Sequence, residues 1–137
     1  MSEETNLGRM GFHHIAMKVH DFDVSYRFYV EGLGFGVKRS WQSKDAAAAL
    51  VDAGNGNYLE IFGGGDRREK QESTITHLAI RVESCDGATE KARSAGARIT
   101  IEPKDVEIPS EPPVRARIAF CEGPDGESIE FFQNDST

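Results

Sequence analysis

Apolar and polar residues alternate along two stretches of the chain that have nearly the same sequence. Residues 14–19 read His-Ile-Ala-Met-Lys-Val, and residues 77–82 read His-Leu-Ala-Ile-Arg-Val. Alternation with a period of two residues predicts a β-strand that buries one face and exposes the other. Because each copy is followed by a helix-like stretch and further strand patterns, the chain is predicted to contain an internal repeat.

Each repeat is predicted to fold as one strand, one helix and three more strands. Asp21 is a candidate N-cap for the first helix, in which large apolar side chains recur at helical spacing. Gly34 and Gly96 follow the two helices and are typical of helix ends. The predicted helices cover residues 22–32 and 86–95, and the predicted strands cover residues 11–19, 35–43, 47–53, 57–62, 75–82, 97–101, 115–121 and 127–133.

The repeat divides the chain into two modules with short flanking segments, an α+β organisation. Four of the five prolines lie within residues 103–113. Because proline lacks the N–H that a ladder needs, this segment is predicted to be a surface loop. Pro124-Asp125-Gly126 predicts a hairpin turn. The predicted parts are an arm over 1–9, a first module over 10–63, a linker over 64–74, a second module over 75–133 and a tail over 134–137.

Two histidines and two glutamates occupy equivalent places in the two repeats. His14 and His77 belong to the first strands, whereas Glu60 and Glu130 belong to the last strands. Strand alternation places all four on the face opposite the aliphatic residues that a helix would cover. Two imidazoles and two carboxylates with open positions beside them suit an octahedral divalent ion. We therefore predict that these four residues share one metal site.

His13 is an alternative to His14 as the ligand from the first repeat. It lies on the helix-facing side of the predicted strand, and the second repeat has Thr76 in its place, so His14 is preferred. A single histidine or glutamate in a strand is more often a solvated or structural residue than a ligand. The agreement of position, strand face and repeat favours a shared site over four unrelated surface residues.

Composition argues against several classes of function. The formal net charge of −7 disfavours nucleic acid as a partner, because phosphate binding needs a basic face. The chain lacks a run of about 18 apolar residues that would cross a bilayer, and its acidic start does not look like a signal peptide. We therefore expect a cytoplasmic protein without a membrane partner. Cys85 and Cys121 are too few for a disulfide scaffold and are expected to be reduced.

Over about residues 10–133 the chain resembles the vicinal oxygen chelate superfamily, also called the glyoxalase/bleomycin resistance/extradiol dioxygenase superfamily. The matching motifs are His-x-Ala at 14–16, Asp21, Tyr29-x-x-x-Leu33-Gly34-Phe35, Thr76-His77-Leu78-Ala79 and Asp125-Gly126-x-x-Ile129-Glu130. The resemblance implies paired βαβββ modules that form a curled mixed sheet around a metal ion. In short members it also implies a homodimer that completes each cup.

Within this superfamily, the ligand order His-Glu-His-Glu is similar to that of the short bacterial glyoxalase I, or lactoylglutathione lyase. That similarity implies a metal-dependent lyase or isomerase that turns the thiol hemithioacetal of a 2-oxoaldehyde into a 2-hydroxyacyl thioester through a metal-bound enediolate. It implies Glu130 as the catalytic base, with Glu60 as ligand and second proton carrier. Nickel or cobalt is favoured, with zinc, manganese and iron as alternatives.

Two other functions remain open on the same fold. One is a different metalloenzyme of the superfamily, such as an epimerase, a thiol transferase or an extradiol dioxygenase. The other is a non-catalytic small-molecule binding protein. Four basic residues are candidates for holding the anionic part of a small substrate such as a glutathione adduct: Lys18, Arg81, Arg115 and Arg117.

These basic residues differ in how well the sequence places them. Lys18 stands where bacterial glyoxalase I typically has an arginine that helps to hold glutathione, so the identity of the thiol stays open. Arg81 falls on the same strand face as the predicted ligands. Alternation within residues 115–120 does not decide the face of Arg115 or Arg117. For these three arginines, solvated strand charges are the alternative interpretation.

Overall fold

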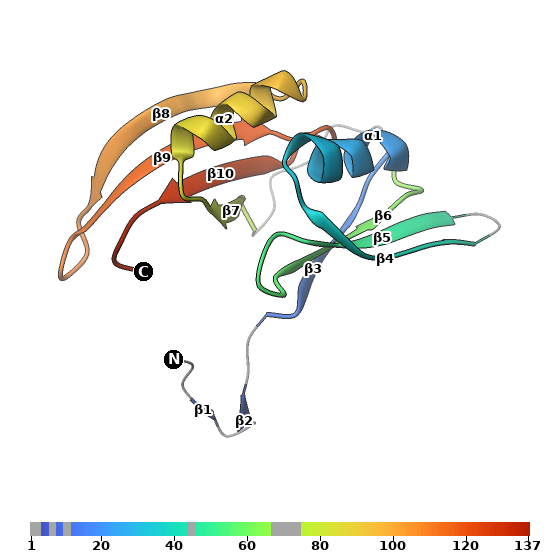
Figure 1. The fold of residues 1–137 in the computed structure, drawn as a ribbon, viewed down its shortest axis with the longest axis horizontal. Coiled ribbons are helices and arrows are strands. Elements are labelled where there is room, and N and C mark those ends of the chain that lie inside the picture. The colour runs from blue at the N-terminus through green and yellow to red at the C-terminus, as the bar shows by residue number, and fades with distance from the viewer. Residues whose placement is uncertain (1–3, 6–7, 10–11, 44–45, 67–74) are drawn as a thin grey trace.

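A computed structural model describes residues 4–5, 8–9, 12–43, 46–66 and 75–137 of the chain. The predicted arm and the predicted linker therefore lie partly outside the described residues. Within the arm, β1 (Glu4–Thr5) and β2 (Gly8–Arg9) pair as a small antiparallel ladder, which stands apart from the rest of the molecule in Figure 1.

Each repeat forms a four-stranded mixed sheet of the same topology (Figure 1). The first sheet has the order β3-β6-β5-β4 and consists of β3 (His14–Lys18), β4 (Gly36–Ser43), β5 (Ala46–Asp52) and β6 (Tyr58–Phe62). The second has the order β7-β10-β9-β8 and consists of β7 (Leu78–Arg81), β8 (Arg98–Ile108), β9 (Val114–Glu122) and β10 (Ser128–Gln133). In both sheets the first strand runs parallel to the last, and the other neighbours are antiparallel. The predicted α+β fold of paired βαβββ modules is confirmed.

The helices begin where side-chain caps satisfy their free N–H groups. The Asp21 carboxylate accepts a hydrogen bond from the backbone of Val24 at 3.2 Å, at the start of α1 (Phe22–Arg27). The Ser84 hydroxyl accepts one from the backbone of Gly87 at 3.0 Å, at the start of α2 (Cys85–Ser94). Among the described residues, no helix is long and apolar enough to cross a membrane.

The first helix differs from its prediction in its second half. After Arg27 the chain continues as a π-helix, η1 (Phe28–Gly32), and the Leu33 N–H donates to the Phe28 carbonyl at 2.9 Å. A π-helical turn holds one more residue than an α-helical turn. The wider turn directs both Phe28 and Tyr29 inward, where they are 4% and 0% exposed.

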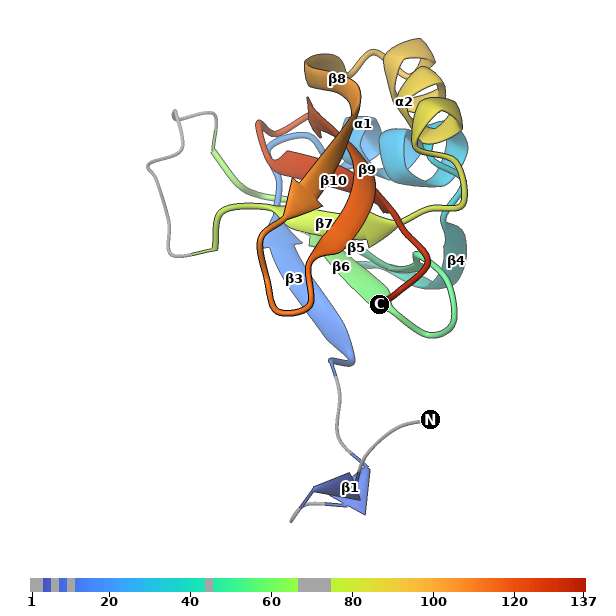
Figure 2. The ribbon, with the colours of Figure 1, turned by 90° about the vertical axis from the view of Figure 1, so that its left-hand side faces the viewer.

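One hydrophobic core joins the two modules beneath the helices. Both helices lie on the same side of the two sheets (Figure 1; Figure 2 shows a view at right angles). The core includes Val19, Phe28, Tyr29, Phe35, Val51, Leu59, Ile61, Cys85, Ala92, Ala119, Cys121, Ile129 and Phe131. The predicted helix-facing residues of the two last strands are thus buried. On the first strand β3, the helix-facing residue Ile15 remains 45% exposed, because β3 is the edge strand of its sheet.

The proline-rich segment was predicted to be a loop, and that prediction is wrong for its first half. Residues 103–108 continue β8, and only residues 109–113 connect it to β9. Pro103 is tolerated because β8 is the outer strand of its sheet and the pairing shifts register between Ile101 and Lys104. The other predicted turn is confirmed, since the Gly126 N–H donates to the Gly123 carbonyl at 3.0 Å.

Candidate metal centre

The first candidate pair consists of a histidine on β3 and a glutamate on β6. These strands are parallel neighbours, and the register sets His14 opposite Tyr58 and Ala16 opposite Glu60. His14 Nε2 lies 3.3 Å from Glu60 Oε1, with 40% of the histidine side chain and 19% of the glutamate side chain exposed. The pair is therefore partly sheltered and accessible from the sheet face that the helix does not cover.

The second repeat reproduces this geometry. His77 precedes β7, and Glu130 on β10 lies opposite Ala79. His77 Nε2 lies 3.2 Å from Glu130 Oε1, with 36% and 12% of the two side chains exposed. A ring of Phe120 on the adjacent strand packs edge-on against His77 at 5.3 Å between centroids. Glu130 is the more deeply buried of the two glutamates, and its residue is 9% exposed.

The structure does not bring the two pairs together within one chain. Across the described residues, no three or more histidine, cysteine, aspartate or glutamate side chains come close enough to hold a metal ion. His14 meets Glu60 and His77 meets Glu130, but each pair stands alone. The site of four ligands therefore stays a prediction, and each pair supplies two of its four donors.

The distances within both pairs fit a divalent ion. Such ions bind imidazole nitrogen and carboxylate oxygen at about 2.0–2.2 Å, so two adjacent ligands of an octahedral ion lie about 3 Å apart. The observed separations of 3.3 and 3.2 Å are close to this value. Each pair has the donor types and spacing of half a coordination shell.

The residue before each histidine contacts the other nitrogen of its ring. His13 Nδ1 lies 3.0 Å from His14 Nδ1, and the Thr76 hydroxyl lies 2.9 Å from His77 Nδ1. The His13 ring also packs against Tyr58 at 5.1 Å between centroids. His13 was the alternative ligand of the first repeat; the structure gives the glutamate contact to His14. Neither contact could be predicted from the order of the residues alone.

In each repeat, the aromatic residue two positions after the glutamate lies on the same sheet face as the glutamate, and a cationic residue of the first strand lies opposite it. Lys18 lies opposite Phe62 in the first repeat, and Arg81 lies opposite Phe132 in the second. Trp41, on the outer strand of the first sheet, packs edge-on against Phe62 at 6.4 Å between centroids. The two repeats therefore place matching apolar and cationic groups beside the two His–Glu pairs.

Arg115 and Arg117 lie on the other face of the second sheet. Their positions on β9 alternate in step with Ala119, which is buried under the helix layer. Arg117 forms ion pairs with Asp86 and with Asp105, both at 3.1 Å. Its hydrogen bond lowers the pKa of the Asp86 carboxyl. The predicted substrate contact of these two arginines does not fit this placement, because the sheet separates them from Glu130.

A cavity of about 880 Å³ lies between the modules near the starts of β3 and β7. His14, Tyr58, Ala79 and Arg81 are among the residues that line it. His14 of the first repeat and Arg81 of the second therefore lie on the walls of the same cavity.

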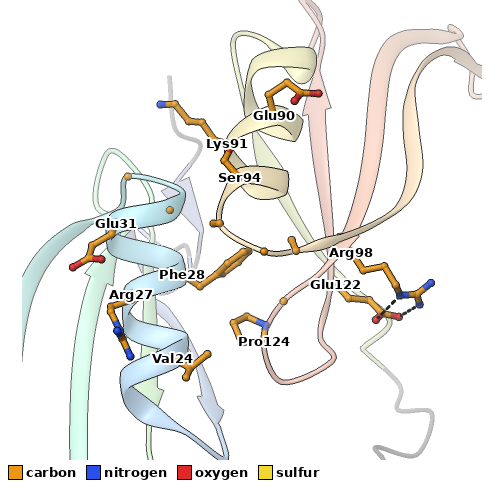
Figure 3. Close-up of a pocket in the computed structure, with 16 residues that line it drawn as sticks. Val24, Arg27, Phe28, Glu31, Glu90, Lys91, Ser94, Arg98, Glu122 and Pro124 are labelled. Atoms are coloured by element: carbon orange, nitrogen blue, oxygen red, sulfur yellow. Dashed lines mark hydrogen bonds and ion pairs between the residues drawn. The ribbon is translucent and has the colours of Figure 1, made fainter.

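A second cleft, of about 990 Å³, lies on the helix side between η1 and α2 (Figure 3). Its charged lining residues are three of each sign: Arg27, Glu31, Glu90, Lys91, Arg98 and Glu122. Arg98 and Glu122 pair with each other. None of the four predicted ligands lines this cleft, so it is not part of the candidate metal centre.

Known proteins resemble the chain along nearly its whole length. The model of the Glyoxalase/Bleomycin resistance protein/Dioxygenase superfamily matches residues 11–131. The lactoylglutathione lyase of Haemophilus influenzae is 29% identical over 130 residues, which cover 90% of this chain and 93% of that protein. YwkD of Bacillus subtilis, an uncharacterised protein, is 32% identical over 127 residues, covering 88% and 94%. The trypanothione-dependent glyoxalase I of Leishmania major matches with a TM-score of 0.69 and 26% identity, covering 90% of this chain and 86% of that one.

Proposed function

Because the chain belongs to the glyoxalase/bleomycin resistance protein/dioxygenase superfamily, we propose that it is a metal-dependent lyase of the glyoxalase I type. It converts the hemithioacetal of a thiol and a 2-oxoaldehyde into a 2-hydroxyacyl thioester. The observation that carries the proposal is the pair of matching His–Glu contacts, at 3.3 and 3.2 Å. Relatives named lactoylglutathione lyase that match across about nine-tenths of the chain support the choice of reaction.

In this proposal a homodimer assembles each metal site. His14 and Glu60 of one protomer face the partner's His77 and Glu130 across a shared cup. Support comes from the isolation of the two pairs within the described part of one chain. Exposed apolar surface before the first strand also supports it, since Phe12 is 91% exposed and stands two residues before His14. Contiguous exposed apolar patches are typical of surfaces that contact another protein, and in this proposal Phe12 belongs to such a patch.

The residues of the chain account for the proton transfer. A divalent ion held by the two His–Glu pairs, nickel or cobalt by preference, would supply Lewis-acid stabilisation of the negative charge that develops on the substrate. Glu130 removes the proton from the carbon that carries sulfur and returns it to the neighbouring carbon. This transfer isomerises the substrate without an oxidant or reductant. The low exposure of the Glu130 side chain, 12%, limits exchange of that proton with water, and Glu60 is the second proton carrier.

Lys18 and Arg81 hold the anionic part of the substrate in this proposal. They lie on the same face as the glutamates, next to Phe62 and Phe132. Replacing either cation with alanine is expected to raise KM more than it lowers kcat, because the contact is present both before and during the reaction. Equal losses in kcat and kcat/KM would contradict this role.

The first test is the metal content of the untagged protein, followed by an assay of nickel- and cobalt-loaded samples with methylglyoxal and glutathione. We expect about one ion per chain and formation of the thioester. Glu130→Gln should lower kcat by at least about 100-fold, the usual scale for losing a positioned base. Glu107→Gln is the matched control, because Glu107 is exposed on β8. A loaded protein that is inactive on this substrate would refute the reaction while leaving the metal site standing.

The second test mixes two inactive double variants to locate the site. One carries His14→Ala with Glu60→Gln, and the other carries His77→Ala with Glu130→Gln. In a heterodimer with shared sites, one site loses all four ligands and the other keeps all four. Random exchange of subunits should therefore restore about a quarter of the wild-type activity and metal content. No recovery from two variants that exchange subunits would contradict assembly across two chains.

A further inference from the structure

Each candidate ligand histidine is preceded by a side chain that contacts the ring nitrogen facing away from the glutamate. Nε2 of both histidines faces a carboxylate, at 3.3 Å for His14 and 3.2 Å for His77. Nδ1 of His14 lies 3.0 Å from His13 Nδ1, and Nδ1 of His77 lies 2.9 Å from the Thr76 hydroxyl. The two repeats thus use different side chains at the same position to make the same contact.

We propose that His13 and Thr76 are positioning residues that hold the imidazoles of His14 and His77 in the orientation and tautomer needed for metal binding. This inference rests on the proposed metal site. A neutral imidazole carries its proton on one nitrogen and a lone pair on the other. A histidine that offers Nε2 to an ion must therefore carry its proton on Nδ1, and that proton needs an acceptor.

The two preceding side chains supply such acceptors. Nδ1–H of His14 donates to Nδ1 of His13, which places the proton of His13 on its own Nε2. Nδ1–H of His77 donates to the hydroxyl oxygen of Thr76. Both acceptors come just before an edge strand, and each is the residue that directly precedes its histidine. They hold the ring even though His14 and His77 are 40% and 36% exposed.

The acceptor in the first repeat is itself fixed by the sheet. The His13 ring packs on the Tyr58 ring at 5.1 Å and a tilt of 56°, and the Tyr58 N–H donates to the His13 carbonyl at 3.2 Å. Tyr58 lies two residues before Glu60 on the same strand. The strand that carries the glutamate therefore also locates the acceptor for its partner histidine.

The experiment measures the dissociation constant of zinc for the metal-stripped full-length protein. Thr76→Val removes the hydroxyl at constant shape, and His13→Phe keeps a ring against Tyr58 without an acceptor. Each is expected to weaken zinc binding about 10- to 100-fold, the scale found for the hydrogen-bond partners of ligand histidines. Thr76→Ser should restore the wild-type value. Thr100→Val and His20→Phe are matched controls at exposed positions and should change nothing.

A spectroscopic measurement on the zinc-loaded protein separates positioning from a general loss of structure. In the wild type, the Nδ1–H protons of the two ligand histidines should be visible and exchange slowly with water. Thr76→Val should speed exchange at His77 and leave His14 unchanged, and His13→Phe should do the reverse. Equal zinc affinity and unchanged exchange in the variants would overturn this inference alone. A wild-type protein that binds no zinc, nickel or cobalt would overturn it together with the proposed function.

Discussion

The phenol of Tyr29 links the helix of the first repeat to the last hairpin of the second. Its O–H donates to Glu127 Oε2 at 2.7 Å, and the other oxygen of that carboxylate accepts from the Asp125 N–H at 2.8 Å. Tyr29 is fully buried, so its hydroxyl has no contact with bulk water in the folded state. Tyr29→Phe deletes the donor and leaves the ring in the core.

A hydrogen bond to a charged group contributes about 1.5–3 kcal/mol, and Tyr29→Phe should lower the free energy of unfolding by that amount. The unfolding entropy is about 2.1 cal/mol/K per residue. For a chain of 137 residues, the expected fall in Tm is therefore about 5–10 °C. Tyr26→Phe is the matched control, because Tyr26 lies on the same helix and has no hydroxyl hydrogen bond among the described residues.

Thermal melts of the single variants and of Tyr29→Phe with Glu127→Gln complete a double-mutant cycle. The coupling free energy between the two substitutions reports the Tyr29–Glu127 hydrogen bond separately from the effect that each substitution has on packing. A coupling below about 0.5 kcal/mol, within the usual error of additivity, would show that the two groups act independently. The reasoning would also be refuted if Tyr26→Phe lowered the Tm as much as Tyr29→Phe.

The same residue predicts a loss of stability at alkaline pH. Burial, and after it the charge of Glu127, raises the pKa of Tyr29 well above its ordinary value of 10.0. Above pH 10 the unfolded chain releases this proton while the folded chain keeps it, so stability that is complete below pH 10 falls as the pH rises. The free energy of unfolding of Tyr29→Phe should therefore fall less steeply above pH 10 than that of the wild type. Identical pH dependence in the two proteins would contradict the assigned shift.

Three further predictions concern single side chains. Burial raises the pKa of the Cys121 thiol from 9.0 to about 11, so the wild type should lose about 2 kcal/mol of stability between pH 9 and 11, and urea unfolding of Cys121→Ala should show a smaller loss over that range. Arg117→Gln breaks the ion pairs with Asp86 and Asp105 and should lower the Tm slightly without changing KM. A raised KM would contradict this placement and would indicate that Arg117 contacts the substrate. Gly32→Ala would place its Cβ 2.6 Å from the Ala95 Cβ and should cost about 1–3 kcal/mol, which Ala95→Gly in the same chain should largely restore.

Local pattern was enough to predict most elements because their causes are local. Period-two alternation located β3 and β6, and the capping carboxylate of Asp21 located the start of α1. The error at β8 arose because the cost of a proline depends on whether its strand is at an edge. Strand order is a tertiary property, and the residues around Pro103 do not reveal it.

Part of the candidate site could likewise be predicted from local pattern, and part depends on tertiary structure. Alternation placed each histidine and glutamate on a common strand face, and the parallel pairing of first and last strands brings them within 3.3 and 3.2 Å. Arg117 forms ion pairs with a helix and with a neighbouring strand, and these contacts show on which sheet face it lies. The sequence around Arg117 does not reveal these contacts. The acceptor roles of His13 and Thr76 depend on ring orientation, which residue order alone does not give.

The topology of the repeat explains why each module carries a matching His–Glu pair. In each module the first strand lies beside the last, so a histidine on one and a glutamate on the other become neighbours when they share a sheet face and lie near the same register. Both helices lie on the same side of the sheets over a common core, and this arrangement sets the two sheets side by side. When two sheet faces lie side by side, their His–Glu pairs cannot both bind the same ion, so each pair needs further ligands from a surface that faces it. In the proposed dimer, the His–Glu pair of the other repeat in the partner subunit provides that surface. The same pairing occurs twice, so one dimer contains two metal centres.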